Sequence, residues 1–339
     1  MRLNICIGGV TLLRHKGLDF TSGICNGVRL NSKAQLELED SILNGIYTSP
    51  EISTSYFTNL VGTWNVETPE GTEVEVLFQV RSEAEWSMWF SYGKWSSEKR
   101  ASFKDQKDHI ALMDIDTIII LGGKAADGLK YKVIMSRNSI ETSSPKLSAI
   151  SAALKLSDND DEIIVEGDKW LRELEVPERS QMVIPEIGNI ICSPTSVAMV
   201  MEYYGVNLPT EEVAEGVYDS GANIYGNWSF NVAYAGSKGF DAYVERYSSS
   251  AGIKNLIAKT MPVVASIRTK EKDDLIGAPQ AYPSGHLIVV RGFTVKNGEE
   301  YIIVNDPAAP NHETVRREYK LSDFEKAWSG IVYILEPKS

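Results

Sequence analysis

In several stretches before residue 157 the apolar side chains of this chain recur at every second position. In the stretch 73–81 valine or phenylalanine occupies every even position, and residues 129–136 repeat the alternation against lysine and serine. A period of two is typical of half-buried β-strands, and no helical period of useful length occurs before residue 160. Turns that contain glycine or proline separate the predicted strands. This part is therefore predicted to form an all-β sandwich, jelly-roll-like in type.

The pattern changes after an acidic, glycine-containing segment at residues 157–168. The clearest helix is predicted at 193–204, with Pro194 in its first turn and Gly205 after its end. Further helices are predicted near 210–217 and 228–237, and strands at 262–268, 286–294, 300–306 and 331–335. We expect a β-sandwich accessory domain at 1–157, an acidic linker at 158–174 and an α+β domain at 175–339.

Size and charge exclude several classes of function. A chain of 339 residues is expected to form two domains. Its formal net charge of −12 and the lack of a dense Lys/Arg stripe predict no nucleic-acid partner. Apolar runs are no longer than strands, so no membrane span is predicted. The N-terminus lacks the continuous apolar core of a secretion signal, which favours a cytoplasmic protein.

Cys192 stands directly before the predicted helix at 193–204. A helix N-terminus stabilises a thiolate, which is the reactive form of cysteine. The alternative is that Cys192 is a small buried hydrophobe. The other two cysteines, Cys6 and Cys25, are expected to be free and buried, with a disulfide between them as the alternative in an exported protein.

His286 and Asp306 are the candidate partners of that thiol. His286 opens a predicted strand after Gly285, and Asp306 ends the next strand, which returns through an Asn297-Gly298 turn. A turn centred on Lys296 would set the two residues opposite each other. A strict two-residue turn would leave them three residues out of step, or roughly 10 Å.

The residue types form a complete set for acyl transfer. A thiol attacks, an imidazole moves its proton, and a carboxylate orients the ring. Gln181, eleven residues before Cys192, is a candidate donor to the oxyanion, with a surface glutamine as the alternative.

Four motifs in this order resemble the bacterial cysteine peptidases of C39-like type, which are relatives of the bacteriocin-leader or double-glycine peptidases. The motifs are Val176-Pro177-Glu178-Arg179-Ser180-Gln181, Cys192-Ser193-Pro194-Thr195-Ser196-Val197-Ala198-Met199, Gly285-His286 and Asn305-Asp306-Pro307. The resemblance covers about residues 170–337. It implies a papain-like cysteine peptidase fold with Cys192 as nucleophile, His286 as base, Asp306 as orienter and Gln181 as oxyanion donor.

The resemblance also bears on the substrate. A recurrent segment at 226–231 implies that Asn227 and Trp228 line the cleft as substrate-binding residues. Leader peptidases usually carry glycine after the cysteine, where this chain has Ser193, and they are fused to membrane transporters. Double-glycine leaders are therefore a poor candidate substrate. Relatives of this type are often exported, which makes an extracellular or cell-surface location the alternative to the cytoplasm.

Ligands other than peptides have weaker signals. The predicted sandwich carries four tryptophans that could stack on a sugar or fill its core, namely Trp64, Trp86, Trp89 and Trp95. The sequence has no metal-ligand spacing and no glycine-rich phosphate loop, so no cofactor and no metal are expected.

The sequence thus predicts a cysteine peptidase, a thiol protease that cleaves a peptide or related amide bond through a thioester intermediate. One alternative is a non-catalytic adhesion or glycan-binding protein with a degenerate peptidase domain. Another is a cysteine acyltransferase. The expected partners are a peptide or protein substrate and, through the N-terminal domain, a glycan or cell-surface ligand.

Overall fold

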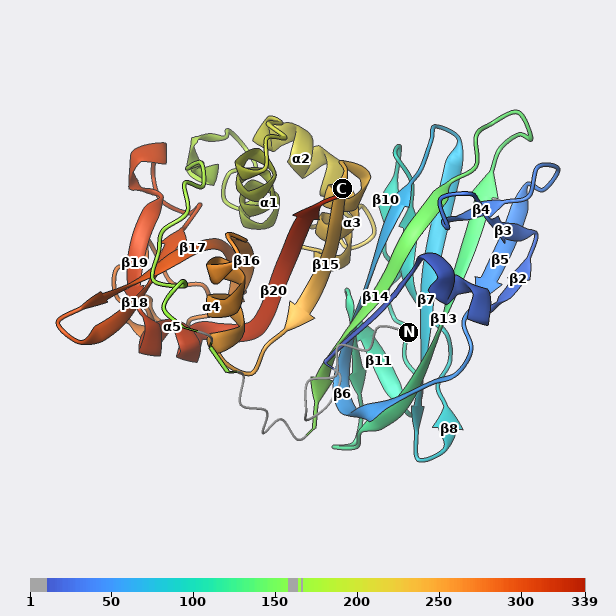
Figure 1. The fold of residues 1–339 in the computed structure, drawn as a ribbon, viewed down its shortest axis with the longest axis horizontal. Coiled ribbons are helices and arrows are strands. Elements are labelled where there is room, and N and C mark those ends of the chain that lie inside the picture. The colour runs from blue at the N-terminus through green and yellow to red at the C-terminus, as the bar shows by residue number, and fades with distance from the viewer. Residues whose placement is uncertain (1–10, 158–163, 166, 339) are drawn as a thin grey trace. The chain divides into compact units, whose positions relative to one another are not determined.

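The computed structural model describes residues 11–157, 164–165 and 167–338. The chain divides into two compact units (Figure 1). The first consists of Met1–Asp161 and Tyr218–Val244, and the second of Glu162–Val217 and Glu245–Ser339.

The first unit is built almost entirely of antiparallel strands. They are β1 (Leu12–Lys16), β2 (Ile24–Asn26), β3 (Val28–Leu30), β4 (Leu36–Leu38), β5 (Asn44–Thr48), β6 (Ile52–Glu67), β7 (Thr72–Ser82), β8 (Glu85–Trp86), β9 (Phe90–Trp95), β10 (Arg100–Ala101), β11 (Ala111–Asp114), β12 (Thr117–Ile120), β13 (Ala126–Arg137) and β14 (Lys146–Leu156), with a 3₁₀ turn at Gly17–Ser22. β13 pairs with β7 and β5, β6 pairs with β14 and β12, and β6 joins β13. The side chains of Trp64, Phe78, Tyr92 and Tyr131 meet in the core between these strands.

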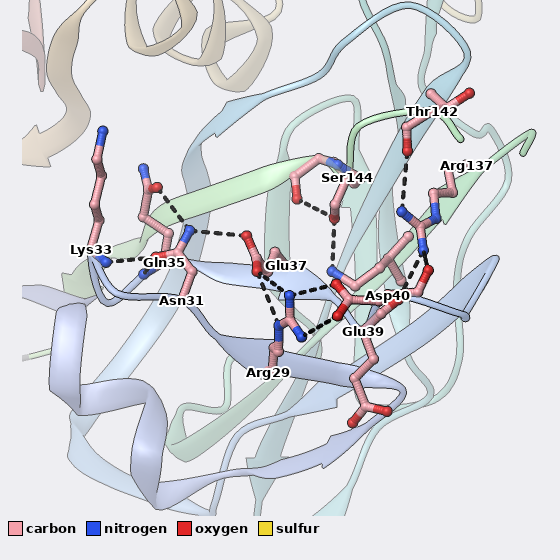
Figure 2. Close-up of polar contacts among 12 residues, drawn as sticks. Arg29, Asn31, Lys33, Gln35, Glu37, Glu39, Asp40, Arg137, Thr142 and Ser144 are labelled. Atoms are coloured by element: carbon pink, nitrogen blue, oxygen red, sulfur yellow. Dashed lines mark hydrogen bonds and ion pairs between the residues drawn. The ribbon is translucent and has the colours of Figure 1, made fainter. Parts of the chain in front are cut away.

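A polar cluster holds the short hairpin β3–β4 in place (Figure 2). Arg29 donates to Glu37 at 3.1 Å and to Asp40 at 2.7 Å. Arg137, at the end of β13, donates to the backbone carbonyls of Glu39 and Asp40. Arg137 thereby ties the end of β13 to the segment that follows β4.

The first unit also contains a helix from the second half of the sequence. This helix, α3 (Trp228–Ser237), packs on β6. Phe230 meets the rings of Trp64 and Trp95 edge-on at 6.1 and 5.4 Å. Ser229 donates to the carbonyl of Gly62 at 2.6 Å.

The chain beyond α3 is held by hydrogen bonds that resemble strand pairing. The side chain of Asn65 donates to the carbonyl of Ala242 at 2.9 Å and accepts from its N–H at 3.0 Å. Arg14 forms an ion pair with Asp241 at 2.5 Å. The predicted division kept 175–339 together, whereas by these contacts Tyr218–Val244 group with the sandwich.

The second unit combines helices with an antiparallel sheet. Its elements are α1 (Cys192–Tyr203), α2 (Thr210–Val217), α4 (Ala251–Ala258), β16 (Val263–Ile267), β17 (His286–Lys296), β18 (Glu299–Asn305), β19 (Arg316–Lys320), α5 (Leu321–Ala327) and β20 (Trp328–Pro337), with 3₁₀ turns at Gln181–Val183, Lys272–Asp274 and His312–Thr314. The strands run in the order β20, β16, β17, β18 and β19. Another strand, β15 (Phe240–Arg246), begins in the first unit and ends in the second.

Helix α1 is the buried centre of the second unit. Its residues are apolar nearly all round, and Ser193–Met201 are buried. Ser193 bonds to the hydroxyl of Tyr333 on β20 at 3.1 Å, and Ser196 donates to the carbonyl of Leu287 on β17 at 3.1 Å. The predicted fold class is confirmed: an all-β part and an α+β part with a papain-like arrangement, in which a central helix packs on an antiparallel sheet. Across the part of the chain that the structure describes, no helix has the length and apolar character to cross a membrane.

Candidate active site

The hairpin β17–β18 determines where two of the predicted site residues lie. Its turn is the two-residue Asn297-Gly298, both with positive φ, so that Lys296 lies opposite Glu299. The register then shifts by one residue between Val290 and Gly292, because Arg291 forms a β-bulge.

This bulge brings His286 and Asp306 to one face of the sheet. A regular ladder would leave them three residues out of step, and an odd offset puts side chains on opposite faces. The bulge sets Val289 opposite Asn305 and reduces the offset to two, which is a diagonal pair on one face. His286 Nε2 lies 2.8 Å from Asp306 Oδ1. The two-residue turn is thus correct, and the 10 Å separation expected from it is wrong.

The bulge is held by the segment before the site. Arg291 accepts the N–H of Leu174 at 2.8 Å, and its side chain donates to the Leu174 carbonyl at 3.0 Å. The same guanidinium donates to Asn305 Oδ1 at 2.9 Å. A Cβ at Gly292 would lie 2.1 Å from the carbonyl oxygen of Arg172, so glycine is needed at this close approach.

Asp306 is fully buried and accepts several hydrogen bonds. The hydroxyls of Tyr282 and Tyr319 both donate to Oδ2 at 2.8 Å, and the N–H of Ala308 donates to Oδ1 at 3.1 Å. Burial raises the pKa of Asp306, but the charge and hydrogen bond of His286 and the two hydroxyls outweigh it and hold the pKa below its usual range. The carboxylate is therefore ionised.

Tyr282 also stacks on His286, with ring centroids 3.9 Å apart and planes 10° from parallel. Sequence reasoning missed Tyr282 and Tyr319. For Tyr282 the available sequence signal was Gly285, which has a φ of +94°. The N–H of Gly285 donates to the carbonyl of Tyr282 and closes a turn, and this turn places the phenol ring against the imidazole.

Cys192 begins α1 and is partly exposed. The His286 imidazole is the neighbour that most lowers the pKa of its thiol. Because Nε2 is taken by Asp306, Nδ1 is the nitrogen left for the sulfur. Burial opposes ionisation, but the hydrogen bond and charge of His286 and the N–H groups of Leu287 and Ser193 lower the pKa of the Cys192 thiol.

The pKa of the His286 imidazole shifts in the opposite direction to that of the thiol. Burial lowers the pKa of His286, but Asp306 and Cys192 overcome this effect and raise it to about 10. A lowered thiol pKa beside a raised imidazole pKa favours a thiolate–imidazolium pair near neutral pH.

Gln181 opens the 3₁₀ turn Gln181–Val183 and is buried, which excludes the surface-glutamine alternative. Its Nε2 donates to the carbonyl of Gly188 at 2.6 Å, and its Oε1 is buried without a hydrogen-bond partner in the described part of the chain. Its backbone N–H donates to Pro307, the residue after Asp306, at 2.8 Å. One N–H of the side-chain amide is thus left for another acceptor.

Two family models match the chain. Residues 173–335 match the Peptidase_C39 like family, and residues 13–154 match the Peptidase C39 N-terminal domain. Residues 173–335 are a peptidase C39-like domain. No curated protein matches the chain.

Three of the solved structures similar to this chain are peptidases of this type. A double-glycine motif protease from an AMS/PCAT transporter, solved with its leader peptide, is 24% identical over 49% of this chain and 94% of its own, with a TM-score of 0.35. The peptidase domain of Streptococcus ComA, a bifunctional ABC transporter, is 19% identical over 46% and 97%, with a TM-score of 0.33. A C39-like peptidase from Bacillus anthracis is 17% identical over 50% and 100%, with a TM-score of 0.37.

The C39-like domain model includes the segment with Asn227 and Trp228, which groups with the sandwich. Asn227 is buried and caps α3, since its Oδ1 accepts the N–H of Phe230 at 3.1 Å. Its Nδ2 donates to Asp219 at 2.9 Å. Both polar groups of its side chain thus have structural partners, and substrate binding by Asn227 and Trp228 stays a prediction.

The four tryptophans of the first unit differ in exposure. Trp64 and Trp95 are core residues, 0% and 2% exposed, and cannot stack on a ligand. Trp86 and Trp89 are half-buried, and the ammonium of a lysine on β13 lies over each ring at 3.9 and 4.3 Å. A glycan ligand for this unit stays a prediction. Among the described residues no three His, Cys, Asp or Glu side chains gather as a metal site would require.

Proposed function

We propose that the C39-like domain hydrolyses a peptide or related amide bond through a thioester on Cys192. The observation that carries the proposal is the pairing of the His286 imidazole with the buried carboxylate of Asp306 at 2.8 Å, beside a Cys192 thiol whose pKa His286 lowers. The thiolate attacks the carbonyl carbon, and the imidazolium protonates the leaving amine as the C–N bond breaks. The imidazole then takes a proton from water, which attacks the thioester and releases the carboxylic acid and the thiol.

Gln181 would stabilise the oxyanion of the tetrahedral intermediate together with the backbone N–H of Cys192. Three features support this role: the amide is buried, Gly188 holds one of its N–H groups, and the backbone N–H of Gln181 is bonded to Pro307. A donor held in place before the reaction needs no reorganisation when charge develops.

Replacing Gln181 with alanine should lower kcat by about 10²–10³ and leave KM nearly unchanged, because the lost hydrogen bond forms only as the oxyanion develops. Steady-state kinetics on any cleaved peptide would measure this effect. Val183→Ala, in the same turn and exposed, is the matched control and should retain turnover. If instead KM rose by a similar factor and kcat were unchanged, Gln181 would act in substrate binding.

The proposed activity is tested by digesting a mixed peptide library with the full chain and identifying the products by mass spectrometry. Wild type should produce new amino termini, and Cys192→Ala should produce none, because no other group in the site can form the thioester. Circular dichroism of both proteins controls for folding. A folded wild type that cleaves no peptide would contradict the peptidase proposal and favour a binding protein.

A further inference from the structure

A hollow of about 670 Å³ in the second unit is lined in part by chain neighbours of the proposed catalytic residues. Met182 and Ala308 form part of its wall. Met182 directly follows Gln181, and the N–H of Ala308 is bonded to Asp306 Oδ1. The hollow is therefore lined by residues directly attached to the proposed oxyanion donor and to the carboxylate.

The charges that line this hollow all have one sign. Among the described residues, Lys272 and Arg317 are the only charged ones that line it, and no carboxylate does. The remaining wall is largely apolar, with Ala278 and Pro279 among its residues. The formal net charge of the whole chain is −12, so the sign of the charge in this hollow is opposite to that of the protein as a whole.

Arg317 has donor capacity that its neighbours do not use. One of its terminal nitrogens donates to the carbonyl of Gly277 at 2.8 Å, which anchors the guanidinium. Its Nε is shielded from solvent and has no hydrogen-bond partner among the described residues. Lys272 is exposed and forms no ion pair with a described residue. The other terminal nitrogen of this anchored guanidinium makes no hydrogen bond with a described residue, which makes it a suitable partner for a carboxylate.

We propose that this hollow binds an acidic side chain of the substrate, aspartate or glutamate, next to the scissile bond. This inference rests on the proposed function and adds the class of substrate. A carboxylate would pair with Arg317 and Lys272, and its methylene groups would lie on the apolar wall. A lysine or arginine there would face two like charges without a counter-ion, so the same pocket rejects basic residues.

The test uses two alkylating reagents of similar size, so it needs no identified substrate. Iodoacetate is an anion and iodoacetamide is neutral, and mass spectrometry measures the rate of each at Cys192. Lys272→Gln and Arg317→Gln should each lower the iodoacetate-to-iodoacetamide rate ratio by about three- to tenfold, and added salt should shrink the difference between wild type and variant. His286 also attracts the anion, but it is present in every variant.

Two control variants distinguish the loss of a positive charge in the hollow from other effects of a substitution on the labelling rates. Arg317→Lys keeps the positive charge and should retain the wild-type ratio. Lys270→Gln removes the same charge from the same exposed segment, outside the hollow, and should also retain it. In the library digest, Asp or Glu should be enriched at one position near the cleaved bond, and Lys272→Gln should reduce that enrichment severalfold.

The outcomes distinguish the two proposals. If Cys192 reacts rapidly but its rate ratio is the same in wild type, Lys272→Gln and Arg317→Gln, the acidic subsite is wrong and the peptidase proposal stands. If Cys192 reacts no faster than Cys25 with iodoacetamide, the peptidase proposal fails and the subsite fails with it.

Discussion

Replacing Asp306 with asparagine should lower peptide turnover by about 10³–10⁴, the size of effect found when a buried carboxylate that orients a catalytic imidazole becomes a neutral amide. In the wild type the charge of Asp306 raises the pKa of His286. An amide supplies no counter-charge, so the imidazolium loses its stabilisation and the thiolate of Cys192 loses its partner.

Iodoacetamide labelling at pH 6 measures this loss without a substrate. Wild-type Cys192 should react at least about tenfold faster than Cys25, because an ordinary thiol is less than ~1% thiolate at that pH. Cys25 is exposed rather than buried as expected, and desolvation followed by the charge of Glu39 raises the pKa of its thiol. It is therefore an accessible but unreactive internal control.

The directions of the two pKa shifts determine how the labelling rate of Cys192 should depend on pH. The thiol pKa is lowered and the pKa of His286 is raised to about 10, so the ion pair persists between the two values. The labelling rate of Cys192 should be nearly level from pH 6 to pH 8, while that of Cys25 should rise about tenfold per pH unit. Tyr319→Phe keeps the carboxylate and removes one donor, so it should cost less than about tenfold in turnover. Unchanged labelling of Cys192 in Asp306→Asn would contradict the ion pair.

Expressing residues 170–339 without the sandwich should fail to produce a soluble, cooperatively folding domain. The truncated chain retains Phe230 but lacks Trp64 and Trp95, which cover it in the full chain. It also lacks Asn65, which satisfies both backbone groups of Ala242. A large exposed apolar face with unpaired backbone groups favours aggregation.

Solubility, circular dichroism and thermal unfolding of the truncated and full chains test this expectation. A milder version uses the full chain: Asn65→Ala should lower the free energy of unfolding by about 1–3 kcal/mol, because it leaves a buried N–H and C=O without partners. Asn26→Ala, at an exposed position of the same unit, is the control and should change it by less than about 0.5 kcal/mol. A truncated chain with sharp unfolding and a reactive Cys192 would show that the sandwich is dispensable.

Local sequence signals predicted α2 and α3 with the observed bounds, since helical period and capping act within a few residues. They did not predict that α3 packs on β6. The partner of Phe230 is Trp64, which lies far away in the sequence, and an apolar helix face does not identify what covers it.

The candidate site was predictable in its residue types and not in its geometry. A cysteine before a helix and a histidine opening a strand are visible as motifs. The bulge at Arg291 is not, because residues 286–290 are buried on both faces and show no alternation from which the register can be read. Tyr282 and Tyr319 were missed because a buried tyrosine in the sequence is indistinguishable from a core aromatic residue.

The path of the chain through the two units has a consequence for its synthesis. The chain leaves the first unit after Asp161, returns at Tyr218 and leaves again at Val244, inside strand β15. Translation proceeds at roughly 5–20 residues per second, so a nascent sandwich waits several seconds for α3 with the surface around Trp64 uncovered. By then Cys192 and its helix have already emerged. A ribosome that stalls between residues 161 and 244 would therefore leave both units incomplete at once, and such nascent chains should depend most on chaperones.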